Sequence, residues 1–277
     1  GSETTDLTVS DAITLDGADE QIHTQSADLT LNGLLSVDNG GLYSSDGTLT
    51  FGGGLNQTSG ELDIDNSTLR LNADLNKTGG TLQTSGTSIT VLSNLNITSN
   101  SAISAKTVEL GDSRLSLGSD TSDLVLSDSL SLQDTDAFLN TGDADLTVEG
   151  DVTLANGKLK SDNGTLILRN GVTQSGSFEF DLGASDLTVE GDVTLANNGK
   201  LKSTSGTLIF RNGVTQSGSF EFDLGASDLT VEGDVTLANN GKLKSTSGTL
   251  IFRNGVTQSG SFEFDLGASI LSLGAGY

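Results

Sequence analysis

The chain has 277 residues and contains no Cys, Met, Trp or Pro. Without Cys it forms no disulfide bond and no thiolate zinc site. Its only histidine is His23. No Ser-His-Asp or metal-ligand arrangement can be built around this residue, so we interpret it as a surface side chain. No apolar run approaches the roughly 20 residues that a membrane-spanning helix needs. We therefore expect no catalytic residue, no metal ligand, no cofactor and no membrane insertion.

Positive charge is also scarce, with 13 basic against 37 acidic residues and a net charge of −24. Residues 1–143 hold 21 acidic and 4 basic residues, a net charge of −17, whereas residues 144–277 hold 16 and 9, a net charge of −7. A surface this acidic repels nucleic acid and anionic lipid, so we expect no nucleic-acid partner. The chain opens on Gly1-Ser2 instead of Met, and we expect it to be a fragment of a longer protein.

What the chain has in abundance is repetition. Segments 186–227 and 228–269 are identical letter for letter, and each divides into two halves of equal length and similar pattern. In both halves apolar residues occupy positions 2, 4, 8 and 16. A period of about 20 residues with alternating apolar positions is typical of a solenoid, in which each repeat forms one coil.

An apolar–x–apolar triplet opens each coil and defines the register. Successive openings are almost evenly spaced, apart from one clearly shorter spacing that separates Val108 from Leu124. We interpret that spacing as a short coil in which the rod narrows or loses a strand. The openings are Leu7/Val9, Leu29/Leu31, Leu49/Phe51, Leu69/Leu71, Ile89/Val91, Val108/Leu110, Leu124/Leu126, Leu146/Val148, Leu166/Leu168, Leu187/Val189, Leu208/Phe210, Leu229/Val231, Leu250/Phe252 and Leu271/Leu273.

In the regular coils two further apolar steps follow the opening, and Gly, Asn, Asp and Ser separate them. Period-2 alternation indicates half-buried strands, and these four residue types tolerate turns. We therefore predict an all-β fold, a right-handed parallel β-helix of about 13–14 coils of about 20–21 residues, with three parallel sheets. Residues 1–277 would form one solenoid domain, with divergent acidic coils over 1–143 and near-identical repeats over 144–277. The expected rod is about 60 Å long.

Three columns of charged residues alternate in sign from one coil of the repeat to the next. Equivalent side chains of stacked coils lie about 4.8 Å apart, so alternation turns repulsion into ladders of opposite pairs. This explains why the identical repeat spans two coils and not one. The columns are Glu149, Arg169, Glu190, Arg211, Glu232 and Arg253; Lys158, Glu179, Lys200, Glu221, Lys242 and Glu263; and Lys160, Asp181, Lys202, Asp223, Lys244 and Asp265.

Other binding motifs are weaker. No Gly-Gly-x-Gly-x-Asp run for calcium occurs, and the acidic segment 16–20 is interpreted as a turn. A column of threonines suits a flat ice-binding face, but its neighbouring outward position alternates between Asp and Gly, so a second threonine file is missing. We interpret this column as a hydroxyl ladder. Its members are Thr153, Thr173, Thr194, Thr215, Thr236 and Thr257.

Stretches such as 150–154 (GDVTL) and 164–168 (GTLIL) resemble the repeats of secreted bacterial β-helix proteins of the filamentous haemagglutinin and autotransporter-passenger families. This resemblance implies a secreted or surface-displayed stalk or adhesin without catalytic residues, for which a host or matrix glycan or protein is a possible partner. The first hypothesis is thus a non-enzymatic structural solenoid. A carbohydrate-binding or polysaccharide-cleaving β-helix is the alternative, and an ice-binding protein a remote one. Since the first and last coils show no evident capping helix and the chain has no Pro to blunt a strand edge, we also expect end-to-end self-association.

Overall fold

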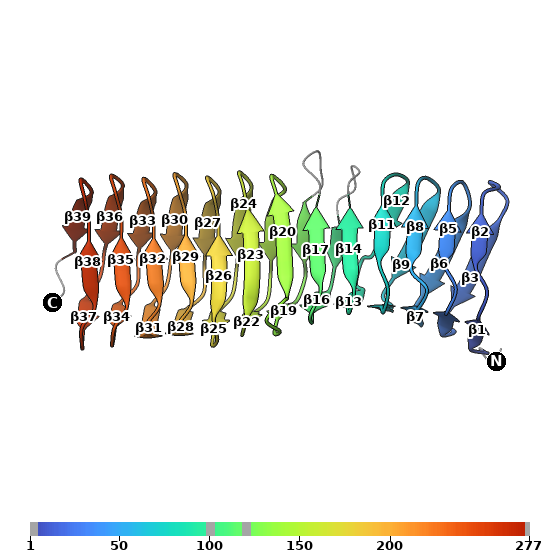
Figure 1. Cartoon of the computed structure of the whole chain (residues 1–277), viewed down its shortest axis with the longest axis horizontal. Coiled ribbons are helices and arrows are strands. Elements are labelled where there is room, and N and C mark those ends of the chain that lie inside the picture. The colour runs from blue at the N-terminus through green and yellow to red at the C-terminus, as the bar shows by residue number, and fades with distance from the viewer. Residues whose placement is uncertain (1–4, 98–102, 118–122, 275–277) are drawn as a thin grey trace.

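The computed structural model describes residues 5–97, 103–117 and 123–274. These residues form 39 short β-strands and no helix, and every strand pair between neighbouring turns is parallel. Figure 1 shows the strands stacked into one elongated rod with the two termini at opposite ends. The prediction of an all-β parallel solenoid is confirmed.

Two sheets of thirteen strands run the whole length of the rod. Sheet A contains β1 (Leu7–Val9), β4 (Leu29–Leu31), β7 (Thr48–Phe51), β10 (Thr68–Leu71), β13 (Ser88–Val91), β16 (Thr107–Leu110), β19 (Leu130–Leu132), β22 (Val152–Leu154), β25 (Val172–Gln174), β28 (Val193–Asn197), β31 (Val214–Gly218), β34 (Val235–Leu237) and β37 (Val256–Gln258). Sheet B contains β2 (Ile13–Leu15), β5 (Leu35–Val37), β8 (Leu55–Gln57), β11 (Leu75–Lys77), β14 (Asn94–Ile97), β17 (Arg114–Leu117), β20 (Phe138–Gly142), β23 (Gly157–Ser161), β26 (Phe178–Asp181), β29 (Lys200–Lys202), β32 (Glu221–Asp223), β35 (Lys242–Lys244) and β38 (Glu263–Asp265).

The third side of the rod is divided into two sheets. Sheet C contains four strands near the N-terminus: β3 (Gln21–Gln25), β6 (Gly41–Ser45), β9 (Glu61–Asp65) and β12 (Thr81–Gln83). Sheet D contains the remaining nine: β15 (Ile103–Ala105), β18 (Leu124–Leu126), β21 (Leu146–Val148), β24 (Thr165–Leu168), β27 (Asp186–Val189), β30 (Thr207–Phe210), β33 (Asp228–Val231), β36 (Thr249–Phe252) and β39 (Ile270–Leu273). The three predicted sheets therefore correspond to three sides, of which one is formed by two sheets.

The chain visits the sides in a fixed order, from sheet A to sheet B to the third side. In Figure 1 the strands of sheet B lie in front and run upward, while successive turns advance from right to left. A chain that rises in front, descends behind and moves leftward winds as a right-handed coil, in agreement with the usual hand of parallel crossovers. Thirteen strands in each long sheet give about twelve turns, somewhat fewer than the number predicted.

The predicted short coil after Val108 is wrong. In sheet A, Val108 pairs with Leu130, and in sheet D, Leu124 pairs with Ile103, so each of these coils has an ordinary length. The apolar triplets up to Val108 therefore lie in sheet A, whereas those from Leu124 onward lie in sheet D. Strands on all sides of the rod share the same alternation of apolar residues. The sequence pattern therefore gives the length of a coil but does not show to which sheet each strand belongs.

The interior is a continuous apolar column from Leu15 to Phe262. Inward residues stack on their equivalents one turn away, as Leu29, Leu49 and Leu69 do in sheet A. Each of these three leucines is at most 1% exposed, and burial of such a side chain contributes about 1.5–3 kcal/mol. This repeated stacking holds the coils together and leaves the alternate, outward residues of each strand to form the surface.

Candidate functional site

The charged columns of sheet B lie on the outside of the rod, where the strand alternation places them. An apolar residue between the two charges of each strand points inward; Leu159, Phe180 and Leu201, for example, are at most 3% exposed. The flanking residues therefore point outward, and strand pairing sets Lys158 beside Glu179 and Lys160 beside Asp181. The same register continues through β38.

The column that begins at Lys158 forms ion pairs on alternate steps. The Nζ–Oε1 distances are 3.2 Å for Lys158–Glu179, 3.4 Å for Lys200–Glu221 and 3.0 Å for Lys242–Glu263. Each of these lysines also approaches the aspartate beside its glutamate, at 2.8 Å for Asp181, 3.1 Å for Asp223 and 3.8 Å for Asp265. The diagonal contacts join the two columns of sheet B, and inspection of each column alone does not predict them.

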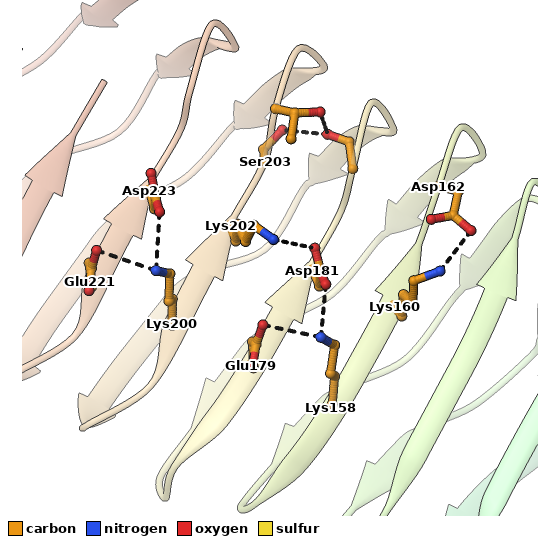
Figure 2. A network of polar contacts seen from close by, with 12 residues as sticks. Lys158, Lys160, Asp162, Glu179, Asp181, Lys200, Lys202, Ser203, Glu221 and Asp223 are labelled. Atoms are coloured by element: carbon orange, nitrogen blue, oxygen red, sulfur yellow. Dashed lines mark hydrogen bonds and ion pairs between the residues drawn. The ribbon is translucent and has the colours of Figure 1, made fainter. Parts of the chain in front are cut away.

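Figure 2 shows how the aspartates bridge the turns. Asp181 accepts from Lys158 on one side and lies 3.6 Å from Lys202 on the other. Asp223 is placed in the same way between Lys200 and Lys244, the latter at 4.0 Å. The steps that lack an ion pair in one column are thus linked through the other column.

The first lysine of the third column is an exception. Lys202 and Lys244 pair with the aspartate of the preceding turn, but the neighbour of Lys160 on the preceding turn is Asn140. Lys160 Nζ instead lies 2.8 Å from Asp162 on its own turn. Figure 2 shows the Lys160–Asp162 pair apart from the rest of the network. The sequence pattern, which pairs Lys160 with Asp181, does not include this local partner.

The members of the remaining column directly follow the C-terminal ends of the sheet D strands. Arg169 lies between Glu149 and Glu190, at 2.9 and 3.4 Å. Glu232 lies between Arg211 and Arg253, at 3.7 and 3.9 Å. Among the described residues, Glu190 and Arg211 are the one neighbouring pair of this column without an ion pair. Since these side chains are 35–60% exposed, each pair contributes little to stability.

The ion-pair networks shift the pKa values of their lysines and aspartates so that the charged forms are favoured. Burial works to lower the pKa of Lys158, but the hydrogen bonds and charges of Asp181 and Glu179 outweigh it and raise this pKa. Burial works to raise the pKa of Asp181, but Lys158 and Lys202 outweigh it and hold the pKa of this carboxyl below its usual value. Both shifts favour the charged forms, so the ladder is an ion-pair network at neutral pH.

A different site lies on sheet C, which the charge columns do not reach. Strand pairing places His23 beside Tyr43 and Tyr43 beside Asp63. The rings of His23 and Tyr43 are stacked, with centroids 4.7 Å apart and an interplanar angle of 11°. A Cβ atom on Gly41 would lie 2.5 Å from the Tyr43 ring, so glycine makes room for the ring to lie across its own strand. His23 is therefore on the surface, as predicted, but it belongs to an aromatic pair.

Three carboxylates line β9 next to this pair. Glu61 accepts hydrogen bonds from Tyr43 Oη and Gln83 Nε2, each at 3.0 Å. Asp63 Oδ1 and Asp65 Oδ1 are shielded from water and accept no hydrogen bond from any described residue. Burial is the main cause that raises the pKa of Asp63, and repulsion from the charges of Asp65 and Glu61 raises it further.

These side chains enclose a shallow cavity of about 210 Å³, lined by His23, Gln25, Tyr43, Ser44, Ser45, Asp63 and Asp65. Within the described ranges no three His, Asp or Glu side chains converge as metal ligands would. The arrangement offers an aromatic wall and carboxylate acceptors side by side. Such a surface suits a polar ligand with hydroxyl or cationic groups. The low aromatic content of the chain did not predict it, because the stack joins strands of successive turns.

Sequence analysis also missed polar residues inside the rod. Gln174 and Gln216 are fully buried at inward positions of sheet A. Gln216 donates to Gly218 O at 2.8 Å and accepts from the Ala238 N–H at 3.0 Å. Gln174 makes the equivalent contacts with Gly176 and Ala196. Each glutamine thus satisfies the backbone of a turn, a role that no periodicity of apolar residues reveals.

Many of the acids that remain outside the columns bind backbone at the turns. Asp145, Asp186 and Asp228 each accept from the backbone N–H of a threonine one turn later, at 2.7 Å. Similar contacts recur in the N-terminal turns, as from Thr48 N–H to Asp28 at 2.7 Å. Part of the acidic composition is therefore a structural requirement of the corners.

The threonine column follows the outer face of sheet A, as the sequence predicted. Strand pairing sets its six members side by side, with Thr153 half-buried and the other five exposed. Asp151 and Gly171 lie two residues before the first two members and continue the alternation of the neighbouring position. The face therefore carries one threonine file.

Within the residues that the structure describes, no helix exists that could cross a membrane. Comparison with known proteins found no matching family model, no matching curated protein and no matching solved structure. The fold class is that of a β-helix repeat protein, and the arguments about its function rest on the geometry of the rod.

Proposed function

We propose that this chain is a non-enzymatic structural β-solenoid, a stalk or adhesin segment that is secreted or displayed on a bacterial surface. The observation that carries the proposal is the continuity of the rod. One apolar column runs from Leu15 to Phe262, and charge ladders accompany it through the C-terminal turns. A uniform core combined with registering charges favours length and rigidity over a reaction centre.

The rod is also proposed to associate end to end. Of the six large apolar side chains that are exposed in the described ranges, four lie on the terminal coils: Leu7 at 50%, Ile270 at 66%, Leu271 at 37% and Leu273 at 60%. The partly buried Val9 and Ile22 at one end, and Val256 and Phe264 at the other, extend these apolar surfaces. The strand edges of the last turn are open as well, so a second copy could continue the sheets.

This association is tested by sedimentation velocity of the whole chain up to millimolar concentration, in high salt, where charged contacts between copies are screened. The double variant I270K/L273K should remain monomeric under conditions in which the wild type associates, because it places two charges in the apolar contact. L92K is the matched control, since Leu92 is 49% exposed but lies away from both ends of the rod. A monomeric wild type at millimolar concentration, or equal association of the end variant, would contradict end-to-end stacking.

A second candidate function is carbohydrate binding, favoured by the cavity on sheet C. Aromatic rings adjoin the carboxylates of Asp63 and Asp65 there, and these side chains line the cavity. A glycan array with the wild type and D63N/D65N tests it, accompanied by a reducing-sugar assay for cleavage. Binding that the double variant loses supports the candidate. An array without any wild-type signal removes it and leaves the structural role intact.

A further inference from the structure

The outward residues of the last six strands of sheet B form a striped surface. Each strand from β23 to β38 presents two charges of the same sign, and the sign reverses at every step. We call these twelve residues the striped face: Lys158, Lys160, Glu179, Asp181, Lys200, Lys202, Glu221, Asp223, Lys242, Lys244, Glu263 and Asp265. Figure 1 shows sheet B along the front of the rod, with no segment crossing over it.

The striped face is electroneutral in a strongly acidic protein. Its six lysines balance its six carboxylates, whereas the chain carries a net charge of −24. Two copies that meet through most other surfaces repel each other, because like net charges oppose contact. The striped face itself adds no net charge to such a contact. At its margin Asp162 pairs with Lys160, and Arg114 and Asp136 lie near Lys158.

The charges of this face remain accessible although they pair within the rod. Lys158 is 31% exposed, and Lys202 and Lys244 are 44% and 45% exposed. The carboxylates range from 18% exposure for Asp181 to 63% for Glu263. A second rod can therefore contact each row while the rows keep their internal partners.

The number of rows decides how two faces can match. Six alternating rows begin with lysines on β23 and end with carboxylates on β38. When a second copy is turned end for end, its sixth row meets the first row, its fifth meets the second, and opposite signs meet at all six positions. A parallel copy in register brings like signs together at all six. We propose that two copies of this chain pair laterally and antiparallel through the striped face, about a two-fold axis between β29 and β32.

The position of the face within the rod favours the same orientation. The six rows are the last six of thirteen in sheet B. In the antiparallel pair the overlap is limited to these rows, and the two N-terminal halves extend in opposite directions. Since residues 1–143 carry a net charge of −17, this separation keeps the most acidic segments apart. A parallel pair, even one shifted by a row, sets these segments side by side.

The predicted pair is weak and sensitive to salt. Six rows span about 24 Å along the rod, so the contact falls below the area of stable interfaces and belongs with transient ones. Its charges are partly exposed, and screening extends over about 3 Å at 1 M salt against about 30 Å at 0.01 M. Association should be measured at low ionic strength and should disappear at high ionic strength.

Two complementary variants provide the test. K200E/K202E makes three consecutive rows negative, and E221K/D223K makes three consecutive rows positive. In the antiparallel pair rows three and four face each other, so either variant alone brings like charges together at both central contacts. A mixture of the two variants restores opposite signs at all six rows. We expect each variant alone to lose at least about tenfold in association, a difference of about 1.4 kcal/mol, and the mixture to recover it.

The readouts separate this pair from end-to-end stacking. An antiparallel lateral dimer has a doubled cross-section over the overlap alone and a length of about 90 Å, whereas two stacked rods keep the single cross-section and reach about 120 Å. Small-angle scattering distinguishes these shapes. Because the chain has no Cys, engineered S10C and S269C provide unique labels near opposite ends. In the antiparallel pair the two C-terminal labels lie at opposite ends of the overlap.

Circular dichroism of each variant checks that it folds. If a double variant unfolds, the single variants K202E and D223K pose the same test with half the charge. Association of the mixture, with neither variant associating alone, supports the proposal. A wild type that stays monomeric at millimolar concentration in low salt, a mixture that fails to associate, or variants that associate as well as the wild type would overturn it. Since I270K/L273K alters the end contact and leaves the striped face intact, the two modes of association are tested separately.

Discussion

Removal of whole coils should reveal that the rod has a two-coil repeat. Deletion of residues 186–227 joins Ser185 to Asp228, which stands in the same sequence context as Asp186. Glu179 then meets Lys242 instead of Lys200, and every remaining pair keeps its sign. We expect this two-coil deletion to give a shorter rod with well-formed coils. The length should fall by about 10 Å, or two strand spacings.

Deletion of residues 207–227 alone, which removes one coil, should behave differently. Strand β29 then meets β35, so Lys200 lies beside Lys242 and Lys202 beside Lys244. At the C-terminal ends of the sheet D strands, Glu190 lies beside Glu232. Three columns thus exchange an opposite neighbour for a like one at a single step.

The loss of stability expected from the one-coil deletion follows from the exposure of these charged side chains. An exposed opposite pair contributes about 0.2–1 kcal/mol, and a like pair costs a similar amount. Three columns then amount to about 1–6 kcal/mol. The side chains of Lys200, Lys202, Lys242 and Lys244 are 33–45% exposed, and screening by solvent favours the lower end, about 1–3 kcal/mol.

The assay is urea unfolding of both deletion proteins in low and high salt. The one-coil deletion also removes Phe222 from the core and Gln216 from sheet A, so a charge-matched control is needed. That control carries the same one-coil deletion together with E232R, K242E, K244E, R253E, E263K and D265K. It restores alternation in all three columns and leaves the core change in place.

The difference between the one-coil deletion and its control isolates the charge effect. The control should be more stable by the amount given above, and the gap should shrink in 1 M salt, where the screening length is about 3 Å. Equal stability of the two proteins in low salt would refute the idea that alternation determines the two-coil repeat. A gap that persists unchanged in high salt would refute its electrostatic origin.

Three substitutions test the interior and the sheet C cavity. Q216L removes the buried amide that donates to Gly218 O and accepts from the Ala238 N–H, which keeps its backbone bond to Gln216 O. It should cost about 1–3 kcal/mol in urea unfolding, whereas Q258L at the exposed last turn should cost less. Burial and neighbouring carboxylates raise the pKa of folded Asp63, so the wild type loses stability as pH rises from the unfolded pKa through the folded pKa of this group. D63N should therefore be more stable at pH 7 than the wild type, with the gain vanishing at about pH 3; a gain that is equal at both pH values would contradict this cause. Burial lowers the pKa of Lys77, so the wild type should gain stability relative to K77M as pH rises from 7 toward about 10.4, and parallel pH profiles would contradict the shift.

The fold was predictable because a solenoid repeats one local pattern. Alternation of apolar residues indicated the strands, and the near-constant spacing indicated the coil, since every turn faces the same packing problem. The side to which each strand belongs was less predictable. Val108 and Leu124 open similar triplets, yet they lie in sheets A and D. Any strand with two inward apolar residues satisfies the pattern. When the triplets that are followed along the sequence pass from sheet A to sheet D, the spacing between them therefore resembles a short coil.

The sequence predicted which charged residues of neighbouring turns lie side by side, but it did not predict all of their ion pairs. Sign alternation at equivalent positions placed Lys158 beside Glu179. The contacts of Lys158 with Asp181 and of Lys160 with Asp162 lie outside a single column, so sign alternation along a column does not indicate them. The aromatic and acidic cavity of sheet C was missed altogether. It depends on single residues in the divergent turns, where no repeat draws attention to a position.

The alternation of charge has consequences both inside and outside the rod. Within one rod it lets a lysine such as Lys200 contact carboxylates on the next turn, so the coils hold their register through many weak pairs. Outside the rod the same rows leave a face without net charge on an acidic protein. An electroneutral striped surface has almost no field beyond its own spacing, so it exerts little attraction at long range but discriminates register on contact.

The two deletions therefore also test lateral pairing. If the two-coil repeat exists for internal register, deletion of residues 186–227 is tolerated, and pairing weakens only through the loss of two rows. Because the four remaining rows still alternate and match when antiparallel, the shortened rod should pair in the same orientation with lower affinity, as sedimentation in low salt would measure. Deletion of residues 207–227 leaves five rows that no longer alternate, so this protein should pair more weakly still. A one-coil deletion protein that paired as well as the wild type would show that the stripes do not direct the contact.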